Sequence, residues 1–229
     1  MENKGFTIIE LLVVVSIIGV LASIVLSSLS EARTRANIVS IQSTLRGFQT
    51  QAIIYQLDND TFTGLCTYSD NTVHESVQML IDKLKSTAGE DRVRCIVRTS
   101  DVGLTNSIHF QEGDQLEQKN FGLAVYYDNK FYAVDVQGVM TLDTANTGGS
   151  VTWPVASQLC ADLGKRLPPI EVLKAVRHTA GGTAGFSTVH FSSTLSNYSS
   201  IYVYRMNMAG NYIRGTRNGA GGGSVRCAS

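Results

Sequence analysis

The sequence predicts an α+β protein with a long N-terminal helix, a head built on an antiparallel sheet, and a small disulfide-stapled α+β module at the C-terminal end. Three observations support this fold class. An apolar stretch near the N-terminus runs into an amphipathic helical pattern, short β-rich runs separated by tight turns follow it, and all four cysteines come after the apolar stretch. An even number of cysteines in an exported chain is typical of disulfides.

The N-terminal apolar stretch is long enough to cross a membrane. From Gly5 to Ser30 the only charged residue is Glu10, and a helix needs roughly 20 apolar residues to span the hydrocarbon core. A carboxylate in such a segment is costly, so Glu10 indicates a site and predicts a partner charge. Cleavage after Gly5 would create an α-amine on Phe6, about one helical turn from Glu10. We expect that amine, in the same subunit or a neighbouring one, to be the partner.

The helix is expected to continue beyond Ser30 as an amphipathic element. Apolar residues recur at spacings of three and four, which is typical of one helix face: Ile38, Ile41, Leu45, Phe48, Ala52 and Tyr55. We therefore expect one helix over residues 6–57, about 75–80 Å long at roughly 1.5 Å per residue. Its first part would lie in a membrane or filament core, and its second part would present its apolar face to a globular head.

Residues 58–142 are expected to form this head. The segment 74–85 has the pattern of a short amphipathic helix. The β-rich runs are residues 91–100, 121–127, 130–136 and 139–142. Asp128-Asn129 is a favourable two-residue hairpin turn. The pattern predicts an antiparallel meander that packs one face against the helix and leaves the other face in water.

Residues 143–150 (DTANTGGS) are small and polar, and are expected to form a linker. Beyond them, residues 151–229 have their own aromatic and aliphatic core candidates, with short helices expected at 153–163 and 170–177. We therefore expect a separate C-terminal module, and a chain truncated after Thr147 is expected to keep a folded, membrane-inserted head.

The four cysteines, Cys66, Cys95, Cys160 and Cys227, allow three pairings. We favour the local pairs Cys66–Cys95 and Cys160–Cys227, because each pair falls inside one expected domain. No two cysteines have C-x-x-C spacing, so neither a structural zinc site nor a redox motif is expected.

Composition and residue spacing exclude several function classes. Lysines plus arginines number 19, and aspartates plus glutamates also number 19. The chain therefore has no excess of positive charge that would indicate specific nucleic-acid binding. The four histidines have no acidic or thiol partners at ligand spacing, so no metal and no cofactor is expected. The serines do not lie in a nucleophile-elbow motif, and the sequence shows no histidine and aspartate pattern typical of a hydrolase. We therefore do not expect an enzyme.

The segment KGFTIIELLVVVSIIGVLA resembles the N-terminus of type IV pilins and pseudopilins, over Lys4 to about Leu29. The resemblance implies that residues 1–5 are a leader peptide removed after Gly5 by prepilin peptidase. It also implies that Phe6 is N-methylated and that Glu10 is needed for assembly with other pilin subunits. The precursor would insert in the cytoplasmic (inner) membrane, and the mature chain would be extracellular in the pilus (fimbrium), with its globular part outside the cytoplasm. A proline common in the family near Ser27 is absent.

A second resemblance covers the C-terminal part. Trp153, Ala156, Cys160, the run Gly164-Lys165-Arg166-Leu167-Pro168, the run Phe191-Ser192-Ser193-Thr194 and the run Val225-Arg226-Cys227 are similar to a C-type-lectin-like module of bacterial surface proteins. That module is related to the formylglycine-generating enzyme fold. The resemblance implies that Cys160 pairs with Cys227. The calcium-dependent sugar motifs of true C-type lectins are absent.

The last third of the chain is rich in residue types favoured at binding surfaces. The candidate binding face comprises Tyr198, Tyr202, Tyr204, Arg205, Tyr212, Arg214 and Arg217, although tyrosine and arginine are also ordinary strand residues. We expect a pilin-like subunit, minor or tip-located, that displays this module for adhesion to a glycan or protein surface. The alternative is a pseudopilin of a type II secretion or DNA-uptake system. An enzyme on the C-terminal fold is disfavoured, since its cysteines are expected in a disulfide.

Overall fold

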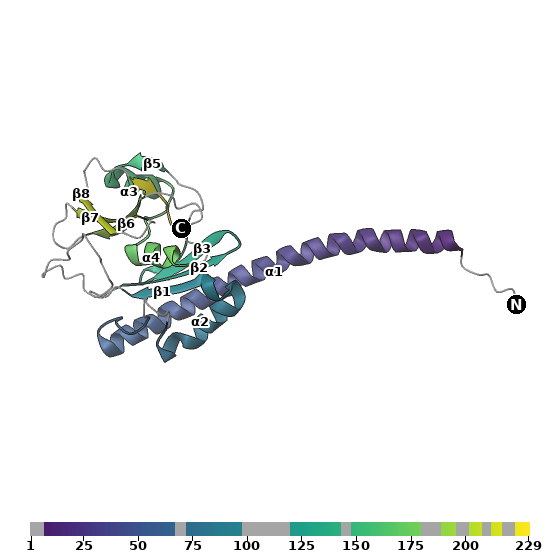
Figure 1. Cartoon of the computed structure of the whole chain (residues 1–229), viewed down its shortest axis with the longest axis horizontal. Helices are drawn as coiled ribbons and strands as arrows, with labels where there is room; N and C mark the ends of the chain where they lie inside the picture. The colour runs from purple at the N-terminus through teal and green to yellow at the C-terminus, as the bar shows by residue number, and fades with distance from the viewer. Residues whose placement is uncertain are drawn as a thin grey trace. The chain divides into compact units, whose positions relative to one another are not determined.

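The computed structural model describes residues 7–66, 72–97, 120–142, 148–179, 189–195, 202–207, 212–216 and 223–229 (Figure 1). The chain divides after Ser40 into two compact units, and the second extends from Ile41 to Ser229. The α+β fold class, with a long helix and an antiparallel sheet, is confirmed.

The first element is helix α1 (Ile8–Asn59), which has 52 residues and matches the expected helix closely. Within the second unit its core face is the predicted one, because Ile41, Leu45, Phe48 and Ala52 are all buried. The helix ends where Asp60 adopts a left-handed backbone conformation, with φ of 58°. Short polar residues tolerate that conformation better than most.

The head contains a four-stranded antiparallel sheet in the order β1-β2-β3-β4. The strands are β1 (Val93–Val97), β2 (Phe121–Tyr127), β3 (Lys130–Asp135) and β4 (Gly138–Leu142). Asp128 and Asn129 both have positive φ, 49° and 59°, as the predicted two-residue hairpin requires. Helix α2 (Glu75–Ala88) is followed by Gly89 at a φ of 113°.

One face of this sheet packs against α1 and α2. The ring of Phe121 in β2 lies 5.5 Å from the ring of Phe48 in α1 and 5.2 Å from that of Phe62 (centroid distances). Val77, Ile81 and Leu84 of α2 are buried as well. The amphipathic stripe of α1 therefore packs as the sequence pattern indicates.

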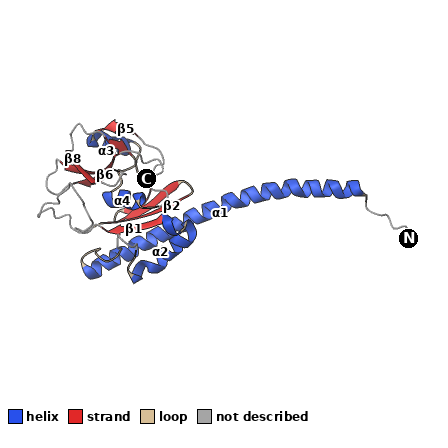
Figure 2. Ribbon diagram, in the orientation of Figure 1, coloured by secondary structure: helices blue, strands red, loops and turns tan. Residues whose placement is uncertain are grey.

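The opposite face of the sheet is not in water, and this expectation was wrong. Helix α4 (Ile170–Arg177) covers it, so that α1 with α2 and α4 lie on opposite sides of the sheet (Figure 2). The shared core contains Ile96, Ala124, Phe131, Ala133, Met140, Leu142, Ile170, Val172, Leu173, Ala175, Val176 and Ala228. Small residues allow this close packing: a Cβ on Gly122 would collide with the Glu171 carbonyl group and the Val172 nitrogen. The sheet is thus the middle layer of three.

The remaining strands form a second sheet in the order β5-β9-β6-β7-β8. Its strands are β5 (Gly148–Val151), β6 (Val189–Leu195), β7 (Tyr202–Asn207), β8 (Tyr212–Thr216) and β9 (Gly223–Val225), and helix α3 (Trp153–Asp162) follows β5 in the chain. A separate small core joins α3 to the last residues through Trp153, Ala156, Cys160, Leu167, Val225 and Cys227. Strand β5 begins inside the expected 143–150 linker. The division into a head (58–142) and a module (151–229) stays a prediction.

Candidate functional site

The start of α1 is organised by a capping box between Thr7 and Glu10. The backbone N–H and the hydroxyl of Thr7 donate to Oε2 of Glu10 at 2.9 and 2.8 Å, and the Glu10 N–H donates to the Thr7 hydroxyl at 3.3 Å. This reciprocal pattern satisfies N–H groups that have no partner inside the helix. The T-x-x-E spacing was readable in the sequence, so Thr7 is a residue that the sequence reasoning missed.

Glu10 is therefore held at the helix start by its own chain. Gly5 and Phe6 lie outside the described residues, so cleavage after Gly5, methylation of Phe6 and a charge pair between the Phe6 amine and Glu10 remain predictions. Both hydrogen bonds from Thr7 are accepted by Oε2 of the carboxylate, and Glu10 is solvent-exposed.

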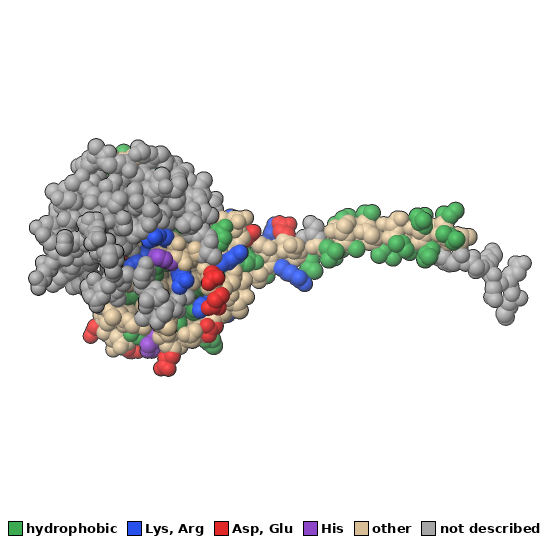
Figure 3. All heavy atoms as spheres, viewed as in Figure 1, with side chains coloured by type: hydrophobic (Ala, Val, Ile, Leu, Met, Phe, Trp, Pro, Cys, Tyr) green, Lys and Arg blue, Asp and Glu red, His purple; other side chains and the backbone are tan. Residues whose placement is uncertain are grey.

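The first part of helix α1 presents an exposed apolar surface (Figure 3). Its large exposed side chains are Ile8, Ile9, Leu11, Leu12, Val13, Val14, Val15, Ile17, Ile18, Val20, Leu21, Ile24, Val25, Leu26 and Leu29. The hydroxyls of Ser16, Ser23 and Ser28 donate to backbone carbonyls one turn earlier, which satisfies them without water. Within the described ranges, α1 is the one helix long and apolar enough to cross a membrane.

Charged side chains mark the end of this apolar surface. Glu31 and Arg35 form an exposed i,i+4 ion pair, and no charged residue lies between Glu10 and Glu31. The position of the pair fits a membrane–water boundary, where charges are no longer costly.

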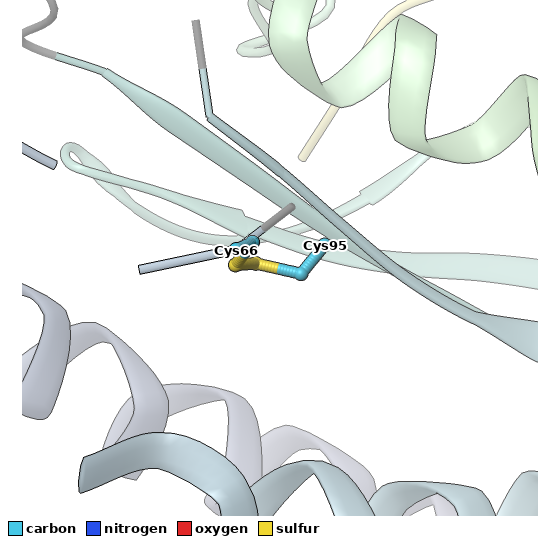
Figure 4. The surroundings of a disulfide bond; sticks show 2 residues. All are labelled: Cys66 and Cys95. Atoms are coloured by element: carbon cyan, nitrogen blue, oxygen red, sulfur yellow. A yellow bond between two sulfur atoms is a disulfide. The ribbon is translucent and has the colours of Figure 1, made fainter. Parts of the chain in front are cut away.

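Both local disulfides are present. Cys66, which follows α1, is bonded to Cys95 in β1 across 5.8 Å between Cα atoms (Figure 4). Cys160 in α3 is bonded to Cys227 across 5.4 Å. All four cysteines are thus paired in the way that the sequence favoured.

The candidate binding face falls on strands β7 and β8, with Tyr198 and Arg217 outside the described residues. The backbone register pairs Tyr204 with Arg214, Tyr202 with Thr216 and Met206 with Tyr212. Directly paired residues belong to the same face of a sheet, so these positions share one face. Arg205 pairs with Ile213 and belongs to the other face. The register therefore divides the candidate set in two.

His178 is a described histidine whose pKa is shifted by its surroundings. His178 follows α4, and its carbonyl accepts a hydrogen bond from Nε of Arg94 at 2.9 Å. Burial and the nearby charges of Arg177, Lys174 and Arg94 lower the pKa of His178 to about 4. Among the described residues, no three His, Cys, Asp or Glu side chains lie close enough together to hold a metal ion.

Comparison with known proteins supports the N-terminal resemblance. Residues 1–26 match the family described as the prokaryotic N-terminal methylation motif. The type IV wide pilus major component PilA4 of Thermus thermophilus is 42% identical over 61 residues, which are 27% of this chain and 47% of that protein.

Two further relatives carry the name type II secretion system core protein G. The protein of Klebsiella michiganensis is 30% identical over 82 residues (36% of this chain and 52% of that protein). The protein of Dickeya chrysanthemi is 36% identical over 61 residues (27% and 40%). The chain thus spans about half the length, or less, of the curated relatives that it matches. No solved structure matches the chain significantly.

The N-terminal region is therefore similar to type IV pilins and to pseudopilins of type II secretion. These matches end well short of the full chain. The resemblance of the C-terminal part to C-type-lectin-like modules stays a prediction.

Proposed function

We propose that this chain is a type IV pilin-like subunit, minor or tip-located, that assembles into a surface filament and displays a binding module for adhesion. The observation that carries the proposal is the methylation motif over residues 1–26, continued by a helix whose large apolar side chains are exposed from Ile8 to Leu29. Such a surface needs lipid or other apolar helices around it.

The chemistry of assembly follows from the helix start. Prepilin peptidase removes residues 1–5, and the new α-amine of Phe6, once methylated, neutralises Glu10 of a neighbouring subunit as the helix leaves the membrane. The capping box with Thr7 uses only Oε2 of the Glu10 carboxylate. Helix capping and charge pairing with a second subunit are therefore compatible.

The display function belongs to the C-terminal sheet. Tyrosine and arginine provide large contact areas with hydrogen-bonding groups, which suits a glycan or a protein surface. The shared face of Tyr202, Tyr204, Tyr212 and Arg214 in the β7–β8 register supports a binding surface of this kind. Size also favours a minor position, since residues 151–229 would add bulk to every subunit of a packed filament.

A second candidate is a pseudopilin of a type II secretion or DNA-uptake system. The similarity to two proteins named type II secretion system core protein G favours it. In that case the C-terminal part would contact exported cargo instead of an external surface.

Immunogold microscopy with an antibody against residues 151–229 distinguishes the two. We expect sparse or terminal label on native surface filaments. Uniform label along the filament would identify a major subunit. Label confined to the cell envelope, with secretion lost on gene deletion, would establish the pseudopilin instead.

Adhesion is tested separately by a Tyr204→Ser/Arg214→Ser double variant. We expect unchanged filaments and about tenfold weaker cell attachment. The reason is that one central contact at an interface contributes more than about 1.4 kcal/mol to the free energy of binding. The control is Lys130→Ser at the exposed β2–β3 hairpin. Normal attachment of the double variant would show that this face does not bind.

A further inference from the structure

The end of helix α4 carries three basic side chains that lie close together. Arg177 and His178 come three and four residues after Lys174, and residues at these spacings are neighbours on a helix surface. All three residues are partly buried. The last turn of α4 therefore concentrates basic groups on one side, where they are only partly in contact with water.

A fourth basic residue, Arg94 in β1, reaches the same place from the head sheet. Arg94 pairs with Ala124 in β2, and Ala124 belongs to the core that α4 covers. Paired residues share a face of the sheet, so Arg94 belongs to the face under α4. Its Nε donates to the carbonyl of His178 at 2.9 Å, which holds the guanidinium at the end of the helix. We call Arg94, Lys174, Arg177 and His178 the basic cluster.

Capping of the helix explains only part of the Arg94 side chain. A cation at a helix C-terminus is favourable because it interacts with the last carbonyl groups, and this contact uses Nε alone. Within the part of the chain that the structure describes, the Nη1 and Nη2 groups of Arg94 donate no hydrogen bond, and Arg94 forms no ion pair. Such a pair of N–H groups fits two oxygens of a carboxylate, sulfate or phosphate.

Positive charge outweighs negative charge around the basic cluster. Burial, followed by the charges of Arg177, Lys174 and Arg94, lowers the pKa of His178 to about 4. Burial also lowers the pKa of Lys174 to about 8, and Arg177 adds to this effect. Among the described residues, Glu171 is the carboxylate that opposes the shift of Lys174, and none opposes that of His178. Like charges in a partly buried place destabilise one another, and an anion among them would relieve this.

We infer that the basic cluster is a binding site for one compact anionic group, a carboxylate, sulfate or phosphate. The Nη groups of Arg94 donate to its oxygens, and Lys174 and Arg177 provide neutralising charge. Helix α4 also contacts β7, so the bound group would lie beside the C-terminal sheet. The site is separate from the shared face of β7 and β8 and does not depend on the proposed filament role.

Nuclear magnetic resonance on the full chain in detergent micelles tests the site, with the sulfate ion as the probe. Sulfate replaces chloride at constant ionic strength and about pH 7, where most Lys174 side chains are charged. We expect the ring signals of His178 to move and to saturate with sulfate. Arg94→Gln should weaken sulfate binding at least about tenfold, because it removes a charged donor pair. The matched control, Lys83→Gln, removes an exposed cation on α2 and should bind sulfate like the wild type.

The absence of a saturable change at His178 in the wild type would overturn the inference. Equal sulfate affinity of Arg94→Gln and the wild type would also overturn it. If Arg94→Gln does not fold, Arg177→Gln takes its place. It keeps the hydrogen bond between Arg94 and the His178 carbonyl and should also weaken sulfate binding several-fold.

A second measurement identifies the source of the anionic group. Retention of the full chain on dextran sulfate beads, but not on plain dextran, would indicate a group carried by a polymer or surface, provided that Arg94→Gln is not retained. Saturable binding of free sulfate without retention on the beads would indicate a small free anion. Both results support the site. Equal retention of Arg94→Gln and the wild type, together with equal sulfate affinity, refutes it.

Discussion

At the scale of single residues, Glu10 combines a local task with a proposed one. Through Thr7 it caps its own helix, as the hydrogen bonds to Oε2 show. Through its charge it is proposed to pair with an α-amine during assembly. Substitutions can separate these tasks, since glutamine retains the hydrogen-bonding shape and loses the charge.

Glu10→Gln is expected to leave cleavage after Gly5 intact and to reduce incorporation into filaments about tenfold or more. The reason is that an α-amine without its partner charge in an apolar core raises the free energy of the assembled filament by more than about 1.4 kcal/mol per subunit. Mass spectrometry of the mature N-terminus and immunoblotting of sheared filaments measure the two steps. Thr7→Val is the matched control, because it removes the capping hydroxyl and keeps the charge. Wild-type incorporation of Glu10→Gln would refute the charge-pairing proposal.

His178 predicts a pH dependence of stability. Burial, with Arg177 and Lys174 on α4 and Arg94 on β1, lowers its pKa from 6.5 to about 4. Between these two pH values the unfolded chain binds a proton at His178 that the folded chain does not bind. The contribution of neutral His178 to the free energy of unfolding is therefore complete above pH 6.5 and is lost as the pH falls towards 4. We expect His178→Gln to show a shallower fall in unfolding free energy over that range in urea titrations. An identical slope in the variant would contradict this.

At the scale of elements, the docking of α4 depends on the absence of a side chain at Gly122. A methyl group there would meet the backbone of Glu171 and Val172, which cannot move away as a flexible side chain could. Asn120, two residues earlier, also contacts the Glu171 carboxylate, at 3.4 Å. The first residues of α4 therefore pack closely against the first residues of β2.

Gly122→Ala is expected to destabilise the protein by about 1–3 kcal/mol through overpacking. Gly47→Ala in α1 is the matched control, because its added methyl group would make an ordinary contact with Leu80 at 3.7 Å. In a helix interior that change should stabilise by about 0.5–1 kcal/mol. Urea unfolding of both variants gives the comparison. Equal stability of Gly122→Ala and wild type would mean that α4 can dock further from the sheet.

At the scale of the whole molecule, the C-terminal part contributes to the core of the head. Removing everything after Thr147 deletes α4 and Ala228, and so uncovers Ile96, Phe131 and Met140 on the sheet. The earlier expectation that such a truncation leaves a folded head therefore has to be revised. Each large side chain returned to water costs about 1.5–3 kcal/mol, and the stability of a domain is only about 5–15 kcal/mol.

We expect the chain truncated after Thr147 to enter the membrane but to show an unfolded or aggregated head. Membrane insertion needs only the apolar part of α1, which remains. Protease sensitivity of the head in membrane fractions is the measurement, with the full-length chain as the control. A protease-resistant truncated head would show that the sheet does not need α4, and would support an independent module at 151–229.

The sequence by itself determined the local features of this protein. The span of α1 follows from apolar residues at helical spacing, and the hairpin at Asp128-Asn129 follows from turn chemistry. The disulfide pairs follow from the expected domain division, because each pair falls inside one expected domain. For the helix and the hairpin the information lies within one element or between neighbouring ones, and period and spacing express it directly.

Only the tertiary structure decided what covers the second face of the head sheet. Small residues on this face have low strand propensity in the sequence: Gly122, Ala124 and Ala133. Only the structure shows that they leave room for α4 to pack closely against the sheet. The pair Asp135–Arg166 joins residues 31 positions apart, and hydrogen bonds join Ser229 to Thr141, which are 88 positions apart. Neither has a periodic signature. Such contacts form between segments that are far apart in the chain. The residue pattern of one segment does not show which distant segment will cover it.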